Sequence, residues 1–480
     1  MYILIEVIKA ADKIDLIYFV RFFAEGRIRE GIRSSALLGR FSWSRLVDVT
    51  GFNKGDYIMA DNQQMWKELG MNLEMHDMLC EVLPGAIGDV FMSQENRPAA
   101  MDYFDMVLAD VHGLRPSELV EFRKNGGKVF GTFCAYVPDE VIFAAGGIAT
   151  GLCAGSQFWV PGGERYLPAN TCPLIKAMLG ARFDKTCPFY RLADVYIGET
   201  TCDGKKKAYE ILGTDVPLHV MDLPQMKRDK DYLKWADEIK ELIAVVEKTT
   251  GNKVTAENLA ENIKKINVKR KALERLYSLR RNTCVPISGT DTLLISQIAY
   301  YDDPERFATM VNKLCDELEQ RVKDGVSVAE GKKRILITGT PMAIPNWKLH
   351  NLIETSGGVV VCEETCTGTR YFENQVDESG STLDEMVQNI ANRYMGINCA
   401  CFTPNTARAD DVIRLAKDSK ADGVIDVNLM FCQTYDIEGR SLEERCKAEG
   451  IPFLGIETDY TDSDAQQLKT RIGAFIEMLG

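Results

Sequence analysis

Cysteine is the residue type whose number and placement in this sequence point most directly to chemistry. The chain has 480 residues, with 14 Cys against only 4 His. Many of the cysteines stand beside residues that form turns or begin helices. These segments are Asn170-Thr-Cys172-Pro173, Lys185-Thr-Cys187-Pro188, Thr201-Cys202-Asp203, Glu364-Thr-Cys366-Thr-Gly368, Cys399-Ala-Cys401 and Cys432-Gln-Thr-Tyr435.

Thiols in such places are suited to bind an iron–sulfur cluster. The clusters take thiolate ligands, and hydrogen-bond donors near the sulfurs tune their potential. A structural zinc site would favour paired Cys-x-x-Cys knuckles, and the sequence contains none. Cys153 and Cys362 end predicted strands and could be either ligands or inert. The cysteines in helical or apolar settings are expected to be inert: Cys80, Cys284, Cys315 and Cys446.

The segment 198–207, Gly-Glu-Thr-Thr-Cys-Asp-Gly-Lys-Lys-Lys, superficially resembles a phosphate-binding loop. A phosphate loop needs Gly-Lys followed by Ser or Thr, whereas Asp203 precedes Gly204 here and no hydroxyl follows the lysines. We therefore reject a nucleotide site. The segment does place Cys202 at a predicted helix start beside three lysines, and these features are expected to lower the pKa of the thiol. A solvated turn without function is the alternative.

Other cofactor and partner classes have little support. The predicted strands are not followed by Gly-x-Gly-x-x-Gly, His-Glu-x-x-His is absent, and the four histidines are scattered. A dinucleotide enzyme, a zinc hydrolase and a Ser-His-Asp enzyme are therefore disfavoured. The formal charge of −13 would repel nucleic acid and anionic lipid.

The compartment is predicted to be the cytoplasm. The apolar start, 1–23, is interrupted by charged residues and reads as a helix instead of an export signal. The uncharged stretch 141–160 contains several glycines and reads as a buried helix, turn and strand, not a membrane span. Cytoplasmic thiols stay reduced, which favours metal binding or catalysis over disulfides.

The elements that must position these cysteines repeat along the chain. A strand over 128–133, a helix from Pro138 to Gly146 and a strand from Ile148 form the strand–helix–strand unit of a parallel sheet. A similar pattern starts again at Arg334. We predict an α/β protein with two doubly wound Rossmann- or flavodoxin-like domains. The expected divisions are a helical N-terminal region at 1–125, the first α/β domain at 126–226, a solvent-facing helical insert at 227–330 and the second α/β domain at 331–480.

Such domains bind ligands beyond the carboxyl ends of their strands. Cys134, Cys202, Cys362 and Cys432 each follow a predicted strand. Two domains that face each other would bring these ends into one cleft.

Three segments resemble a known family. Asn-Thr-Cys-Pro-Leu-Ile-Lys at 170–176, the 198–207 segment and Phe-Cys-Gln-Thr-Tyr at 431–435 are similar to the 2-hydroxyacyl-CoA dehydratase and benzoyl-CoA reductase superfamily. Within it the chain resembles the double-cubane cluster proteins, a reductase branch. The resemblance covers roughly residues 65–480 and does not extend to the first 40 or so residues.

The resemblance implies a redox protein of anaerobes, with iron–sulfur at the junction of two α/β domains. By position, Cys172, Cys202 and Cys432 would bind one 4Fe–4S cluster. Two cubanes linked by a sulfide need further thiolates. The candidates are Cys134, Cys187, Cys366 and one of Cys399 and Cys401, of which we favour Cys401 because the side chains of an extended Cys-x-Cys diverge.

The resemblance also implies partners and leaves alternatives. Electrons would come from a separate ATP-hydrolysing activator with its own cluster, the substrate would be a small molecule, and a homodimer is expected. Thr340 stands where some relatives are expected to have Cys. The leading hypothesis is a low-potential reductase; the rivals are a single-cluster dehydratase subunit and a non-enzymatic electron carrier or cluster scaffold. Catalytic acid–base groups are not identified, although Glu140, Glu364 and Asp203 lie near the cysteine motifs.

Overall fold

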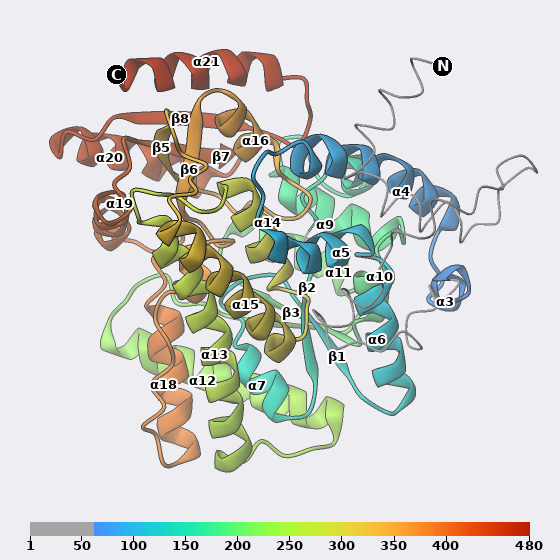
Figure 1. Cartoon of the computed structure of the whole chain (residues 1–480). Coiled ribbons are helices and arrows are strands. Elements are labelled where there is room, and N and C mark those ends of the chain that lie inside the picture. Colours follow the sequence, from blue (N-terminus) through green and yellow to red (C-terminus); the bar gives the residue numbers. More distant parts are fainter. Residues whose placement is uncertain (1–61, 153) are drawn as a thin grey trace, which may run out of the picture.

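The structure of the protein is a computed structural model that describes residues 62–152 and 154–480. It contains two four-stranded parallel sheets with the same strand order, β2-β1-β3-β4 and β6-β5-β7-β8. The predicted pair of doubly wound α/β units is therefore confirmed, and Figure 1 shows the two sheets as separate bodies. The strands are β1 (Val129–Thr132), β2 (Ile148–Gly151), β3 (Val195–Glu199), β4 (Leu218–Met221), β5 (Lys333–Gly339), β6 (Gly358–Glu364), β7 (Gly423–Leu429) and β8 (Phe453–Thr458).

The strand order places a topological switch point in each sheet. The chain leaves β1 to one side to form β2 and returns to the other side of β1 to form β3, and β5, β6 and β7 repeat this path. Every residue of β6 and β7 is buried, as expected for parallel strands that are covered on both faces. The loops beyond β1 and β3, and beyond β5 and β7, are therefore the expected ligand sites.

Short helices connect the strands of each sheet, as the alternating pattern predicts. The helices are α7 (Asp139–Ala144), α8 (Val160–Glu164), α9 (Pro173–Phe183), α10 (Pro188–Leu192) and α11 (Asp203–Leu212) around the first sheet, and α16 (Lys348–Thr355), α17 (Thr369–Phe372), α18 (Leu383–Met395), α19 (Thr406–Asp418), α20 (Gln433–Ala448) and α21 (Ala465–Met478) around the second. Helices were predicted at the positions of α7, α11, α16, α19, α20 and α21, although α20 begins earlier than expected, whereas α8, α9, α10, α17 and α18 were missed.

The stretch between the sheets is helical, as predicted, but it does not simply face solvent. Every residue of α14 is buried, because this apolar helix packs against β6, α16 and α5. The helix α13 contacts α7 of the first half and α17 of the second. These helices therefore join the two sheets. They are α12 (Asp229–Thr250), α13 (Ala256–Arg280), α14 (Gly289–Ile298) and α15 (Pro304–Lys323).

Two polar contacts show how the halves are held together. Arg280 on α13 forms a fully buried ion pair with Glu363 on β6, with Nη1 2.8 Å from Oε2. Tyr394 on α18 donates a hydrogen bond to Glu140 Oε2 of α7 over 2.8 Å. Because α18 also packs along α12 at the lower edge of Figure 1, a helix of the second half completes the core of the first.

The described N-terminal part is helical, as predicted. The first two described helices are separated at Gly70, whose φ of +66° is a left-handed conformation that glycine tolerates. The predicted helix at 1–23 lies outside the described residues. The elements are α3 (Asn62–Glu68), α4 (Leu73–Ile87), the π-helix η2 (Gly88–Met92), the 3-10 helix η3 (Ala99–Met101), α5 (Asp102–Ala109) and α6 (Leu114–Lys124).

Among the described helices, none combines the length and the apolar character that a bilayer crossing requires. The uncharged stretch 141–160 folds as the end of α7, the strand β2 and the 3-10 helix η4 (Gln157–Trp159), as expected.

Candidate functional site

Three of the predicted thiols lie at helix N-termini. Cys172, Cys202 and Cys432 are the N-cap residues of α9, α11 and α20. Cys172 and Cys432 hydrogen-bond to each other, and Cys202 is close enough to interact electrostatically with both. We call these the N-cap thiols. They bring together α9 and α11 of the first half and α20 of the second.

The backbone of each helix points donors at its N-cap thiol. The N–H of Lys205 donates to Cys202 Sγ over 3.4 Å, and the N–H groups of Leu174 and Ile175 face Cys172. Hydrogen bonding from Cys432 and from these N–H groups lowers the pKa of Cys172, whereas bonding to Cys172 and burial raise the pKa of Cys432. Within this pair the thiolate form is therefore favoured at Cys172 over Cys432.

The lowered pKa expected for Cys202 is wrong. Burial raises the pKa of this thiol and outweighs the opposing effect of Lys205. The three lysines are already engaged by carboxylates, since Lys205 pairs with the buried Glu199, Lys206 with Asp203 and Lys207 with Glu210. These carboxylates largely compensate the positive charge of the lysines, so the lysines stabilise the Cys202 thiolate only weakly.

A second group of thiols comes from loops on both sides of the junction. Cys134 follows β1, Cys366 follows β6, and Cys399 and Cys401 lie between α18 and α19. Cys134 interacts electrostatically with Cys366, Cys399 and Cys401. We call these four the loop thiols. Burial raises the pKa of Cys134 well above its ordinary value and that of Cys366 to about 11.

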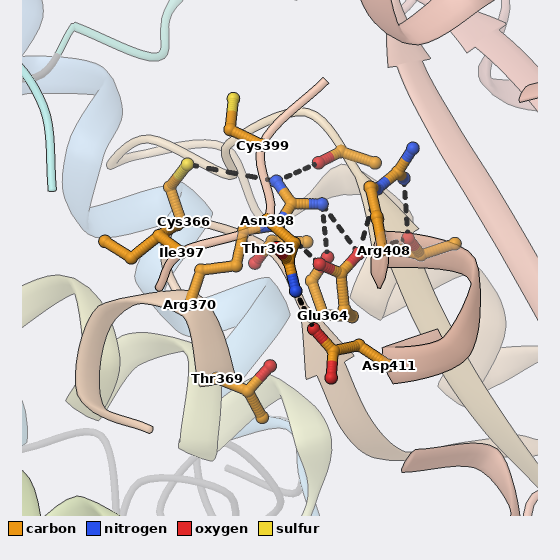
Figure 2. Close-up of polar contacts among 12 residues, drawn as sticks. Glu364, Thr365, Cys366, Thr369, Arg370, Ile397, Asn398, Cys399, Arg408 and Asp411 are labelled. Carbon is orange, nitrogen blue, oxygen red and sulfur yellow. Dashed lines mark hydrogen bonds and ion pairs between the residues drawn. The ribbon is translucent and has the colours of Figure 1, made fainter. Parts of the chain in front are cut away.

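The guanidinium of Arg370 supports the loop thiols. Its Nη1 lies 3.9 Å from Cys366 Sγ and also donates to Tyr435 Oη. That hydroxyl is in turn 3.3 Å from Cys399 Sγ. Figure 2 shows the sulfurs of Cys366 and Cys399 on the same side of Arg370. A cation thus contacts the sulfur of Cys366, and a hydroxyl bound to the same cation contacts the sulfur of Cys399.

Arg370 is fixed by a buried carboxylate. Glu364 at the end of β6 accepts hydrogen bonds from Arg370, from Thr338 on β5 over 2.6 Å and from Arg408 on α19 over 3.3 Å (Figure 2). Burial opposes ionisation, but the charges of Arg370 and Arg408 outweigh it and lower the pKa of Glu364. Glu364 therefore positions the arginine and stays ionised.

The premise for choosing Cys401 over Cys399 is wrong. The segment is not extended: a turn, with Phe402 N donating to Cys399 O over 3.1 Å, brings the two thiols together. They hydrogen-bond to each other, and this bond lowers the pKa of Cys399 and raises that of Cys401. Both thiols can therefore reach the same site.

A buried ion pair is close to both groups of thiols. Glu199, at the end of β3, pairs with Lys205 of α11. Both charges act on Cys134 of the loop group and on Cys202 of the N-cap group. The two groups are therefore neighbours at one junction.

The remaining predicted positions lie elsewhere or have structural partners. Cys187 is the N-cap of α10, where it faces the N–H groups of Phe189 and Tyr190, and it belongs to neither group. Thr340 donates to Val427 O over 2.9 Å and so links the ends of β5 and β7. Glu140 pairs with Arg270 over 2.6 Å, and Asp203 is exposed and pairs with Lys206 over 2.7 Å. Cys153 lies outside the described residues.

Sequence reasoning missed the cations and the hydroxyl around the loop thiols. Arg370 and Lys227 carried no motif signal. Lys227 reaches the loop from the other half, since its Nζ donates to Ile397 O over 2.9 Å. Tyr435 was inside a quoted motif, but only the fold shows that its hydroxyl faces Cys399. Tyr136 likewise crosses the junction and donates to Ile397 O over 3.1 Å.

The donor chemistry fits an iron–sulfur cluster better than a single ion. A tetrahedral zinc with sulfur ligands at about 2.3 Å needs its sulfurs to be within about 4 Å of one another. Among the described residues, no three of the N-cap or loop thiols form so close a group. The thiolates of a cluster bind different irons and stand farther apart. Backbone N–H groups and cations near the sulfurs also suit clusters.

Comparison with known proteins gives the family. The model of the family "2-hydroxyglutaryl-CoA dehydratase, D-component" matches residues 134–479. The chain is 35% identical over 364 residues to the putative dehydratase subunit YjiM of Escherichia coli (strain K12), covering 75% of this chain and 94% of that protein.

Two more distant relatives are named as enzyme subunits. The chain is 25% identical to the (R)-phenyllactyl-CoA dehydratase beta subunit of Clostridium sporogenes, with 74% of this chain and 93% of that protein covered. It is 23% identical to a subunit of the benzoyl-CoA reductase of Thauera aromatica, with 73% and 91% covered. The matched residues include three strands of the first sheet, the whole second sheet and both groups of thiols. The chain belongs to the 2-hydroxyglutaryl-CoA dehydratase D-component family.

Proposed function

We propose that the protein is an iron–sulfur reductase that holds two linked 4Fe–4S cubanes and reduces small molecules at low potential. The observation that carries this proposal is the convergence of two groups of thiols at one junction. A single cubane would use only one of these groups. The location we propose is the cytoplasm, and the assembly a homodimer.

The proposed ligands are three thiols from each group. The N-cap thiols Cys172, Cys202 and Cys432 would hold one cubane. Cys134, Cys366 and Cys399 would hold the other, with Cys401 as the hydrogen-bonding neighbour of Cys399. We choose Cys399 because it and Cys366 share the support of Arg370 and Tyr435. Cys187 is left out because it lies apart from both groups.

The protein's own residues would set the conditions at the clusters. When bound, the clusters supply electrons one at a time at low potential. The N–H groups at the starts of α9 and α11 and the guanidinium of Arg370 would offset the negative charge of the sulfurs and so set the potential. Of the proposed ligands, Cys172 and Cys399 are buried, and the other four thiols are partly exposed.

The electron source would be a separate ATP-hydrolysing activator protein with its own cluster. The sequence contains neither a phosphate loop nor a dinucleotide fingerprint, so ATP is expected to be used by the partner. Docking of the activator is expected near the carboxyl ends of β1, β3, β6 and β7, since the thiols lie there.

A second candidate function is a dehydratase subunit that binds an acyl-CoA at a single 4Fe–4S cluster. The names of the relatives from Escherichia coli and Clostridium sporogenes favour it. In that case the N-cap thiols would hold the cluster and the loop thiols would not bind iron. The iron content of ligand variants separates the two functions.

The proposed reductase function is tested by the requirements of electron transfer. The anaerobically purified chain is mixed with the activator, ATP, a strong reductant and a small test substrate, and each component is omitted in turn. We expect bleaching of the cluster absorbance and substrate reduction only when all components are present. Steady turnover with NADPH and no partner, or tight binding of ATP to the chain alone, would contradict the proposal.

A further inference from the structure

A compact group of metal-binding side chains lies among the N-terminal helices, before the residues that the family model matches. His76 and Cys80 are one turn apart on α4, so both point from the same face of that helix. His112 lies in the turn between α5 and α6. The ligand atoms of the three residues are all within 4.8 Å of one another. Among the described residues, this is the one group of three His, Cys, Asp or Glu side chains whose ligand atoms lie this close together.

The distances are close to those of a tetrahedral metal site. His76 Nε2 is 3.0 Å from His112 Nδ1 and 3.6 Å from Cys80 Sγ. With metal–nitrogen bonds of about 2.0–2.1 Å and a metal–sulfur bond of about 2.3 Å, tetrahedral angles place such atoms about 3.3–3.6 Å apart. The two distances from His76 Nε2 are within a few tenths of an ångström of these values, and the third pair, Cys80 and His112, lies within 4.8 Å. A movement of at most about one ångström at that pair would therefore admit an ion.

Neighbouring residues orient the ligands. His76 is fully buried, and its Nδ1 faces Asp77 Oδ1 at 3.5 Å, which leaves Nε2 directed at His112. A carboxylate on the second ring nitrogen is the usual support of a metal-binding histidine. Trp66 on α3 packs against His76 with the two rings tilted and their centroids 4.2 Å apart. The indole Nε1 of Trp66 donates to His112 O over 2.9 Å, so one side chain steadies both histidines.

We propose that His76, Cys80 and His112 bind one divalent transition-metal ion of the zinc class. Two imidazole nitrogens and one thiolate are ligands that zinc accepts. Cys80 and His112 are partly exposed, so a water molecule can fill the fourth position. The ion would tie α4 to the turn between α5 and α6. This proposal replaces the expectation that Cys80 is inert. No pattern in the sequence indicated the site, because His76 and His112 are 36 residues apart in the chain.

The proposal is independent of the iron–sulfur function, because its ligands belong to neither group of thiols. Zinc and iron are measured by mass spectrometry on the anaerobically purified full-length chain after dialysis against a weak chelator. We expect about one zinc per chain in the wild type, as one four-coordinate site holds one ion. Cys80→Ser and His112→Asn should reduce zinc to background and leave iron unchanged. Cys284→Ser, which removes a thiol outside all three groups, should retain both metals.

Three further measurements guard against misfolded variants and adventitious zinc. Circular dichroism is expected to match the wild type for both variants, since Cys80 and His112 are partly exposed. Added Zn²⁺ should raise the melting temperature of metal-stripped wild type and not that of Cys80→Ser. Added Co²⁺ should give a thiolate charge-transfer band that Cys80→Ser lacks. Zinc that dialysis removes from the wild type, or an equal zinc content in wild type and Cys80→Ser, would overturn the proposal.

Discussion

The hydroxyl of Tyr435 lies 3.3 Å from the sulfur of Cys399, and the same hydroxyl accepts a hydrogen bond from Arg370. Tyr435 is on α20, whose N-cap is Cys432. One helix therefore carries an N-cap thiol at its start and a hydroxyl that reaches the loop thiols within its first turn. This links the two groups of thiols through a single rigid element.

Tyr435→Phe is expected to retain its iron but to make the reduction potential of the cluster at the loop thiols more negative. The variant loses a hydrogen-bond donor near Cys399, and donors to cluster sulfurs stabilise the reduced, more negative state. A redox titration followed by electron paramagnetic resonance measures the shift. Tyr301→Phe is the matched control, because its buried hydroxyl makes no hydrogen bond within the described residues and its ring packs on Phe189. An unchanged potential in Tyr435→Phe would argue against this arrangement.

Cys399→Ser and Cys401→Ser are expected to differ although the two thiols hydrogen-bond to each other. Loss of the proposed ligand Cys399 should remove about half of the iron, since each of two cubanes holds about four atoms. Cys401→Ser should keep the wild-type iron content. Iron and acid-labile sulfide assays decide between them, and the reverse pattern would show that Cys401 is the ligand.

Arg280→Met is expected to destabilise the fold strongly. The variant leaves Glu363 without its fully buried partner, and breaking such a pair by removing one member costs about 3–5 kcal/mol. The double variant Arg280→Met/Glu363→Gln should recover part of the loss, because no buried charge is left uncompensated. Denaturant unfolding gives the free energies. A double variant that is no more stable than Arg280→Met would refute this explanation.

The same carboxylate predicts a dependence of stability on pH. Burial alone would raise the pKa of Glu363, but Arg280 and His350 outweigh it and lower the pKa to about 2. The stabilisation is therefore complete above the ordinary pKa of about 4.3 and is lost as the pH falls from there towards 2. The double variant Arg280→Met/Glu363→Gln should lose less unfolding free energy than the wild type as the pH falls over this interval. Denaturant unfolding at a series of pH values measures this difference. Parallel curves for the wild type and the double variant would exclude the assignment.

Much of the fold could be predicted from the sequence, because parallel strands in an α/β protein are short apolar runs between glycines and helices. The strands after Lys128 and Arg334 are such runs. The helix α18 was missed although the sequence carries its signal: the apolar residues recur at helical spacing, and Thr382 and Glu385 form a capping box at its start. The burial of α14 was also missed, because it depends on β6 and α5, which are distant in sequence.

The candidate site was predictable only at the level of residue type. Cysteines at predicted helix starts and strand ends indicated iron–sulfur ligands, and the N-cap positions of Cys172, Cys202 and Cys432 agree with that reasoning. The division into two groups depends on how the sheets face each other, which no local pattern encodes. The turn that brings Cys399 beside Cys401 and the contacts of Arg370 are tertiary features for the same reason.

The most direct test of the two-cubane account is the iron content of three matched proteins purified anaerobically: the wild type, Cys202→Ser and Cys366→Ser. Cys202 belongs to the N-cap thiols and Cys366 to the loop thiols. The account predicts about eight irons per chain in the wild type and about four in each variant, because each substitution removes a ligand of one cubane. About four irons in the wild type, with none lost in Cys366→Ser and all lost in Cys202→Ser, would contradict it and show that the chain holds a single cluster at the N-cap thiols.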